Sequence, residues 1–342
     1  METFSIRAHL ERRFGTKVPR AGHAECPKCQ HKTLAVKGDA LAKCFHPACG
    51  WFANGNAGRR QAHSGLLGDA MCAMHAHLRG LHDGPARDYL LKERKVHDRL
   101  LEDCPVLGVV PPTVDLRPAI AGGERAILEG AAKDRRERAE AFRKIGEDLE
   151  GRLRRLAGHL AFGYSDAHGN LLSLKFREPY TKRIETFKPG ALAGVFNPTM
   201  FLPEQELRDW RRFLLLVEGE FNVLTLQSLH AELGQGYVNA IALGGSSAPD
   251  LQTLKGFGKG WDWYLWGDSD EAGRALATHM QEQATFHYVE SPFSGDDLDG
   301  YIRGQDRGSK AALESVRKRI GEAKPRYRTV ESIREAIGAI RD

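Results

Sequence analysis

Four short apolar runs in the C-terminal half of the chain, each separated from the next by a segment of helix length, place the strongest constraint on its fold. Strands buried on both faces of a parallel sheet read as continuous apolar runs, and parallel strands need a long crossover between them. The pattern therefore predicts parallel β–α units in a covered sheet. The runs are FLLLV at Phe213–Val217, VNAIAL at 238–243, WYLW at 263–266 and TFHYV at 285–289.

The length and charge of the chain set the broad class. With 342 residues it exceeds what one hydrophobic core usually organises, so two or three domains are expected. Residues 206–303 carry 7 Lys and Arg against 15 Asp and Glu, whereas the remainder carries 43 against 30. This asymmetry suits a protein that handles a polyanion beside an acidic centre, although solubility alone can also produce it.

Membrane and export signals are not evident in the sequence. No apolar run approaches the roughly 20 residues that a membrane-spanning helix needs, and the N-terminus lacks the apolar core of a signal peptide. We therefore expect a soluble, cytoplasmic protein with no membrane partner.

Cysteines occur in two spaced pairs near the N-terminus. Two residues separate Cys26 from Cys29, four separate Cys44 from Cys49, and fourteen lie between the pairs. Such pairs on tight turns supply the four thiolates of a closed tetrahedral zinc site, and the residues between them would form the β-hairpin of a zinc ribbon. His46 is the alternative ligand, which would leave Cys44 free.

Acidic residues follow three of the four expected strands: Glu218, Asp268, Asp270, Asp297 and Asp299. The carboxyl ends of parallel strands line one crevice, so we expect these side chains to converge. Two like charges about 4 Å apart repel by about 4 kcal/mol at an effective dielectric of 20. A cation between the carboxylates would offset this repulsion, and Mg²⁺ is suited to the place because it binds carboxylate oxygens. Helix capping is the alternative for Asp270 and for either Asp296 or Asp297, but it leaves Glu218 and Asp268 unexplained.

Four segments resemble the Toprim domain: LVEGEFNVLTL, ALGGSS, WGDSDEAGRALA and GDDLDGYI. In this resemblance Glu218 is the Toprim glutamate, and Asp268 and Asp270 are its DxD pair. Cysteine pairs, then a basic region, then Toprim is an order similar to that of bacterial DnaG-type and phage-type DNA primases. Residues 86–112 also resemble the start of their polymerase core, so the resemblance covers about 20–112 and 158–304.

The resemblance implies a multidomain fold with α+β and α/β parts. The implied divisions are a zinc ribbon at 1–60, a helical and basic subdomain with a small sheet at 61–205, a Toprim domain with a parallel sheet at 206–304, and a helical tail at 305–342.

The resemblance also implies an activity, DNA-directed synthesis of short RNA primers by metal-dependent nucleotidyl transfer. Asp268 and Asp270, with Asp297 and Asp299 nearby, would hold Mg²⁺ or Mn²⁺, and Glu218 would be a ligand or the general base. The zinc would be structural. The implied partners are a single-stranded DNA template, ribonucleoside triphosphates and a replicative helicase. No GxxxxGK[ST] loop is present, so we expect a short stand-alone primase, as from a phage, plasmid or other mobile element.

Three basic residues are candidates for contacts with the template backbone or with triphosphates. The alternation in LLSLKFRE predicts a strand with Lys175 and Arg177 on its polar face, and Lys188 follows. Cationic side chains in such a place can bind phosphates. The alternative is a solvated edge strand, on which lysines discourage aggregation.

The chain departs from the family pattern in three places. Asn222 stands where the family usually has an aspartate, the second cysteine pair is two residues wider, and 113–157 has no counterpart that we recognise and reads as an inserted helical arm. Two rival functions follow. One is a Toprim nuclease, which would cut with the same acids. The other is a catalytically reduced replication accessory protein that binds single-stranded DNA, which Asn222 favours.

Overall fold

The computed structural model divides the chain into two compact units, Met1–Ala62 and His63–Asp342. The residues that the structure describes are 24–25, 34–37, 41–44, 52–54, 61–130, 134–167, 169–190, 193–198, 213–234, 239–244, 254, 262–291, 297–304 and 308–326.

The first unit contains a three-stranded antiparallel sheet in the order β1-β2-β3. Its strands are β1 (Leu34–Lys37), β2 (Leu41–Cys44) and β3 (Phe52–Asn54). The β1–β2 hairpin, in which Leu34 lies opposite Cys44, falls where the sequence predicts one. Cys26, Cys29, Cys49 and the alternative ligand His46 lie outside the described residues, and only the backbone of Cys44 is described. The zinc site therefore stays a prediction.

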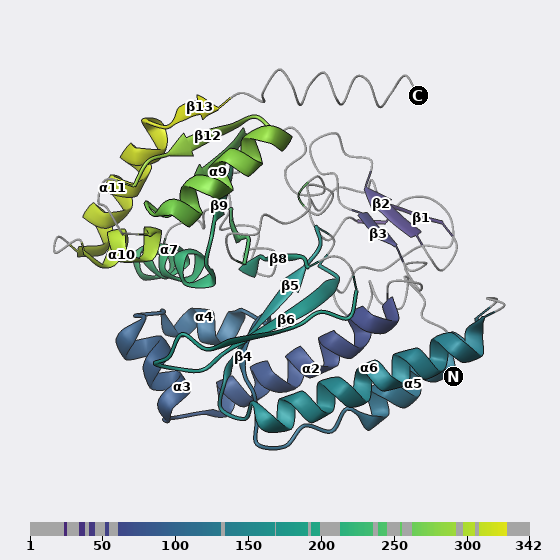
Figure 1. Cartoon of the computed structure of the whole chain (residues 1–342). Coiled ribbons are helices and arrows are strands. Elements are labelled where there is room, and N and C mark those ends of the chain that lie inside the picture. The colour runs from purple at the N-terminus through teal and green to yellow at the C-terminus, as the bar shows by residue number, and fades with distance from the viewer. Residues whose placement is uncertain are drawn as a thin grey trace, which may run out of the picture. The chain divides into compact units, whose positions relative to one another are not determined.

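The second unit is built on one mixed sheet of ten strands in the order β13-β12-β11-β9-β10-β8-β5-β6-β7, with β4 paired to β5 (Figure 1). The strands are β4 (Leu107–Val109), β5 (Leu160–Ser165), β6 (Leu171–Arg177), β7 (Ile184–Phe187), β8 (Val195–Phe196), β9 (Phe213–Val217), β10 (Ala240–Ala242), β11 (Asp262–Trp266), β12 (Phe286–Val289) and β13 (Lys324–Arg326).

The four apolar runs form the parallel part of this sheet, as the sequence predicts. Strand β9 lies between β10 and β11 and is parallel to both, and β12 is parallel to β11. Val217 at the end of β9 is in register with Trp266 at the end of β11. The carboxyl ends of these two strands therefore lie side by side at one edge.

Strand β8 joins the antiparallel strands and the parallel strands. Strand β8 pairs antiparallel with β10 through Ala242 and Phe196, and on its other side it pairs with β5. The small antiparallel sheet and the parallel sheet are consequently continuous. An unpaired β10 edge would leave buried backbone groups without hydrogen bonds, and β8 covers it.

Helices cover both faces of the parallel strands. The apolar side chains of α9 pack with Leu214, Leu216 and Leu265 of β9 and β11, whereas Trp266, which alternates to the opposite face, contacts the ring of Tyr301 in α10. The helices of this part are α7 (Glu220–Leu233), α9 (Glu271–Gln283), α10 (Leu298–Arg303) and α11 (Gly308–Gly321). The expected helical tail thus contains α11, followed by strand β13, which pairs with β12.

The remaining helices belong to the segment before β9. They are α2 (Gln61–Gly80), α3 (Pro85–Asp88), the π-helix η1 (Tyr89–Glu93), α4 (Asp98–Asp103), α5 (Arg117–Leu128) and α6 (Arg135–Arg155). Across the described residues, no helix combines the length and the low charge that crossing a bilayer would require.

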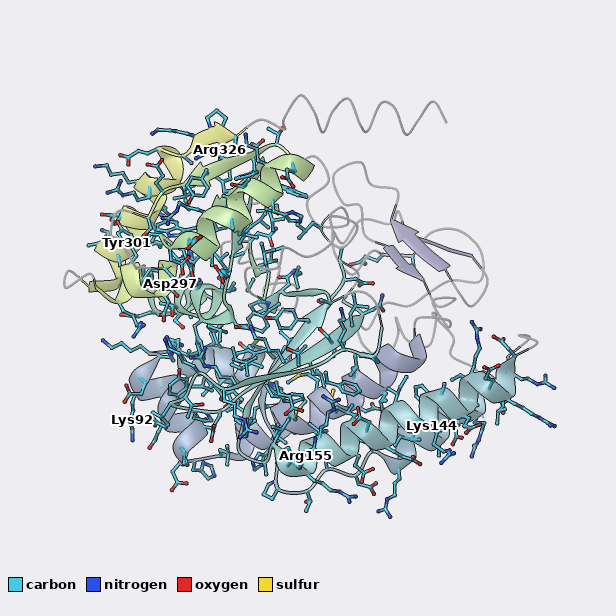
Figure 2. The ribbon with its side chains drawn as sticks, viewed as in Figure 1. Lys92, Lys144, Arg155, Asp297, Tyr301 and Arg326 are labelled. Carbon is cyan, nitrogen blue, oxygen red and sulfur yellow. The ribbon has the colours of Figure 1, made fainter. Side chains whose placement is uncertain are left out.

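Helices α5 and α6 account for the segment 113–157 as a helix pair. They pack closely because glycines replace larger side chains at the contact: a Cβ at Gly146 would lie 2.5 Å from Cγ1 of Ile120. The outward face of α6 is charged and includes Lys144 and Arg155 (Figure 2). Many of these charges pair along the helix, as Lys144 does with Glu140 at 2.9 Å.

Replacing Gly146 with alanine should destabilise the protein, because the added methyl group overlaps Ile120 and overpacking typically costs about 1–3 kcal/mol. Gly151→Ala is the matched control in the same helix, since no atom lies within 4 Å of the new Cβ. The control should gain up to about 1 kcal/mol from helix propensity. Urea denaturation of both variants measures the difference, and equal unfolding free energies would contradict this packing.

Candidate active site

Two carboxylates meet at the carboxyl ends of β9 and β11. Glu218 comes directly after β9, and Asp268 lies two residues beyond the end of β11. The in-register pairing of the two strands brings both side chains to the same edge of the sheet. Glu218 Oε2 and Asp268 Oδ1 are both buried, and neither has a hydrogen-bond partner among the described residues. Buried carboxylate oxygens without a donor are costly, so this edge is suited to a cation.

Burial and the negative charges of neighbouring acids raise the pKa values of this pair. The pKa of Asp268 rises to about 7, first because the carboxyl is buried and then because Glu218, Asp297 and Asp270 are negative. Burial also raises the pKa of Glu218, followed by the charge of Asp270, whereas the contact with the Asp268 carboxyl and the charge of Lys175 oppose this rise. Near neutral pH the pair therefore carries less than two full negative charges unless a cation joins it.

Asp270 and Asp297 are helix caps. Oδ1 of Asp270 accepts a hydrogen bond from Gly273 N at 2.8 Å at the start of α9, and Oδ1 of Asp297 accepts one from Gly300 N at 2.7 Å at the start of α10 (Asp297 is labelled in Figure 2). Capping, the alternative that the sequence left open, is therefore confirmed for both. Their charges also raise the pKa of Asp268, so the two caps add to the negative potential of the carboxylate pair.

Asp299 forms a buried ion-pair network, which the sequence did not anticipate. Its side chain is 1% exposed. Oδ1 accepts hydrogen bonds from Thr225 Oγ1 at 2.7 Å and from Arg303 Nε at 2.8 Å. Oδ2 accepts from Arg94 at 2.6 Å and again from Arg303 at 2.8 Å. Both oxygens are thus occupied by fixed donors, and the expectation that Asp299 belongs to the metal set does not fit this arrangement.

Asn222 supports the same network. Its side chain is buried in α7, and its Oδ1 accepts a hydrogen bond from the backbone N–H of Asp299 at 2.9 Å. The residue that departs from the family pattern therefore anchors the first turn of α10. Arg94 joins this network from 205 residues away in the sequence, so no local pattern could have identified it.

Lys175 is also committed to an internal contact. Its Nζ lies 2.8 Å from Glu220 Oε1 and donates a hydrogen bond to the carbonyl of Gly244 at 3.1 Å. The hydroxyl of Tyr164 donates to the same Glu220 oxygen. The Lys175 side chain is 13% exposed, so at this position β6 is not the solvated edge strand that the sequence left as an alternative. The charge of Lys175 acts on Glu218.

The other two predicted basic residues are placed differently. The guanidinium of Arg177 lies 5.2 Å from the ring centre of Phe221, and its Nε is buried without a hydrogen-bond partner among the described residues. Arg94 lies over the same ring at 4.4 Å. Lys188 is exposed just beyond β7. Lys188 is thus exposed to solvent, whereas the Nε of Arg177 is buried.

The metal that the sequence predicts would therefore have few protein ligands. Within the described ranges, no group of three or more His, Cys, Asp and Glu side chains is placed to hold an ion. Mg²⁺ usually keeps several waters and is bound through one or two carboxylates together with substrate phosphates. The unpartnered oxygens of Glu218 and Asp268 fit that mode of binding.

Comparison with known proteins gives a fold but no sequence family. No family model matches the chain, and no curated protein sequence matches it. A solved DnaG primase catalytic domain bound to single-stranded DNA is 19% identical, with 79% of this chain and 81% of that chain covered and a TM-score of 0.51. A primase fragment of Aquifex aeolicus with zinc-binding and RNA polymerase domains is 16% identical, with 94% and 83% covered and a TM-score of 0.48. The chain thus has the fold of a DnaG primase catalytic core.

Replacing Asp299 with asparagine tests whether it is structural. Arg94 and Arg303 would remain partly buried opposite a neutral amide, and breaking a buried pair typically costs about 3–5 kcal/mol. We expect the unfolding free energy in denaturant to fall by about 3 kcal/mol. An unchanged value would contradict the assigned network. Asp270→Asn is the control, because asparagine caps helices about as well as aspartate does.

Replacing Asp268 with asparagine should stabilise the metal-free protein at high pH. The folded carboxyl keeps its proton up to about pH 7, whereas the unfolded carboxyl loses it near pH 3.9. The wild type therefore loses stability as pH rises between these values, and the variant does not. In EDTA, the melting temperature of the variant should exceed that of the wild type at pH 8 and match it near pH 4.

The control for this comparison is Asp262→Asn, at the exposed start of the same strand. It should shift the melting temperature little at either pH. Equal melting temperatures for Asp268→Asn and the wild type at pH 8 would contradict the proposed repulsion.

Proposed function

We propose that this chain is a DNA primase, which condenses ribonucleoside triphosphates into short RNA primers on single-stranded DNA. The observation that carries the proposal is the pair of Glu218 and Asp268 at the end of two parallel strands, because each keeps one buried carboxylate oxygen with no hydrogen-bond partner among the described residues. It lies in a chain with the fold of a DnaG primase catalytic core. Functions are borne by such sites and not by folds alone, so the two observations are needed together.

The proposed domain roles follow the sequence. We propose that the segment around Glu218 and Asp268, residues 206–304, acts as a Toprim domain, that 61–205 is the basic subdomain, and that 305–342 is a tail. For residues 1–60 we propose a zinc ribbon, with Cys26, Cys29, Cys44 and Cys49 as ligands of a structural zinc. Paired cysteines of this spacing support that assignment.

The catalytic metal would be held by Glu218 and Asp268, with Asp270 and Asp297 close by. When bound, Mg²⁺ or Mn²⁺ would neutralise charge on the triphosphate and polarise the α-phosphate. The raised pKa values of Glu218 and Asp268 support this assignment, since they reflect burial first and then the negative charge of neighbouring acids. We leave Asp299 out of the metal set because its oxygens are already bound by arginines and a threonine.

The reaction needs accurate positioning more than covalent chemistry. The 3′-hydroxyl oxygen of one nucleotide forms a bond to the α-phosphorus of the next, the bond from that phosphorus to the bridging oxygen breaks, and pyrophosphate leaves. The hydroxyl proton must pass to a base. Glu218 has two possible roles here, metal ligand and general base, and Asp268 shares its charge in either case. Lys175 would help by holding Glu220, the first residue of α7, next to Glu218.

Single-stranded DNA is the proposed template. The neighbour with a TM-score of 0.51 is described as bound to single-stranded DNA, which supports the same class of ligand here. The proposed contacts to phosphates are Arg177 and Lys188. Arg177 has a buried nitrogen without a hydrogen-bond partner among the described residues, and Lys188 is exposed. A separate replicative helicase is the proposed partner protein.

Asp268→Ala should reduce primer synthesis by about a hundredfold or more, because each tenfold loss in rate requires only about 1.4 kcal/mol of lost transition-state stabilisation. The affinity for single-stranded DNA should change less than about twofold, because contacts of basic side chains with DNA phosphates dominate that affinity. Primers are measured with labelled ribonucleotides, Mg²⁺ and a single-stranded template, and binding by fluorescence anisotropy.

The same assay separates the rival functions. Shortened template in place of new RNA would indicate a nuclease, and DNA binding with neither product would indicate an accessory protein. Asp262→Ala is the control and should synthesise primers at the wild-type rate. Full synthesis by Asp268→Ala would remove the basis for the proposal.

A further inference from the structure

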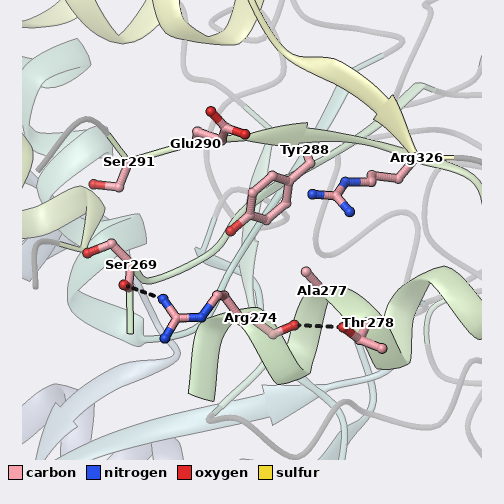
Figure 3. A pocket seen from close by; sticks show the side chains of 8 residues that line it. All are labelled: Ser269, Arg274, Ala277, Thr278, Tyr288, Glu290, Ser291 and Arg326. Carbon is pink, nitrogen blue, oxygen red and sulfur yellow. Dashed lines mark hydrogen bonds between the residues drawn. The ribbon is translucent and has the colours of Figure 1, made fainter. Parts of the chain in front are cut away.

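A pocket of about 390 Å³ lies beside the carboxylate pair, between α9 and the edge strands β12 and β13. Figure 3 shows its lining. Arg274 and Thr278 come from α9, Tyr288 from β12, and Arg326 from β13, and Ser269 and Ser291 follow strands β11 and β12. None of these residues belongs to the metal set proposed above.

The pocket carries two arginines that have no carboxylate partner in the described part of the chain. Arg274 donates from Nη1 to the backbone carbonyl of Ser269 at 3.0 Å, and the guanidinium of Arg326 lies over the ring of Tyr288 at 5.1 Å. Glu290, the one acid in the lining, is 3.9 Å from Lys324. The pocket is therefore net positive, and both guanidinium groups retain donors for a ligand.

Hydroxyl groups accompany the arginines. Ser291 Oγ is buried and has no hydrogen-bond partner among the described residues. The hydroxyl of Tyr288 lies against the turn that leads from β11 to Asp268, since a Cβ at Gly267 would be 3.2 Å from it. Planar guanidinium forks combined with hydroxyl donors are the groups that bind phosphates in proteins.

The sheet order places this pocket on the outer side of Asp268. Strands run in the order β12-β11-β9, so Glu218 follows β9, Asp268 follows the central strand β11, and the pocket lies over β12. Ser269, which lines the pocket, is the next residue after Asp268. The pocket therefore neighbours Asp268 both along the chain and across the sheet.

We propose that this pocket binds the terminal phosphates of the incoming nucleotide, which leave as pyrophosphate. The inference rests on the proposed function and deepens it, because it assigns the leaving group to Arg274, Arg326 and Ser291. When the bond to the α-phosphorus breaks, the bridging oxygen keeps the electron pair, and negative charge grows on the departing group. Two guanidinium groups fixed at that point stabilise this charge.

The test measures pyrophosphate binding directly. Pyrophosphate is titrated into the full chain by calorimetry at low ionic strength, with and without Mg²⁺. The double substitution Arg274→Gln and Arg326→Gln should weaken binding at least tenfold, and Ser291→Ala should weaken it less. Lys310→Gln with Lys318→Gln is the control, since it removes the same charge from the exposed face of α11 outside the pocket. That control should bind pyrophosphate within about twofold of the wild type if contacts inside the pocket hold the ligand. A similar loss of affinity in the control would indicate attraction by the net charge of the protein.

A second measurement separates this inference from the proposed function. If primers are made, the arginine double variant should need at least tenfold more pyrophosphate for half-inhibition, and it should raise KM for ribonucleotides. Priming that remains equally sensitive to pyrophosphate in this variant, with unchanged calorimetric binding, would overturn the pocket assignment and leave the primase proposal intact.

The opposite result is also informative. Pyrophosphate binding that depends on Arg274 and Arg326 in a chain that makes no primers would support the phosphate pocket and count against the primase proposal. Adenosine triphosphate and pyrophosphate are titrated in parallel to identify the source of the phosphates. Weaker binding of both in the double variant is the expected result, and an unchanged affinity for both would overturn the inference. Melting temperatures of all variants identify any loss of folding.

Discussion

The close approach of Glu218 and Asp268 is the constraint on which the rest of the site depends. Parallel pairing of β9 with β11 places both carboxylates at one edge of the sheet, where each side chain is partly buried. Burial first, and then the negative charges of Glu218, Asp297 and Asp270, raise the pKa of Asp268 to about 7. The two carboxylates are held close to each other because β9 and β11, the strands that precede them, lie in the hydrophobic core.

The acidic residues near this edge differ in whether a basic side chain of the protein compensates their charge. Asp299 is bound by two arginines and Glu220 by Lys175, so their charges are compensated inside the protein. Glu218 and Asp268 keep buried oxygens without such partners. A buried acid that is already paired gains little from an external cation, whereas an unpaired one gains much. This difference singles out the carboxylate pair as the proposed metal site.

The two ion-pair networks also connect distant parts of the second unit. Lys175 on β6 joins Glu220 at the start of α7, and Arg94 after the π-helix joins Asp299 on α10. Strand β8 makes the sheet continuous between the antiparallel and parallel parts. The carboxylate edge is thereby fixed from both sides, which is the rigidity that catalysis by positioning requires. The proposed phosphate pocket extends the same edge beyond β12.

The sequence by itself determined the features that depend on local pattern. Continuous apolar runs predicted the parallel strands, and residues directly after them predicted the carboxylate edge. Helix capping was the alternative that the sequence left open for Asp270 and Asp297. The sequence could not determine which acids are free, because Arg94, one partner of Asp299, lies 205 residues from it, and Glu220, the partner of Lys175, lies 45 residues away. Pairing at such separation depends on how helices and strands pack. Only the tertiary structure therefore decided that Lys175 is internal, that Asp299 is structural, and that Arg274 and Arg326 share one pocket.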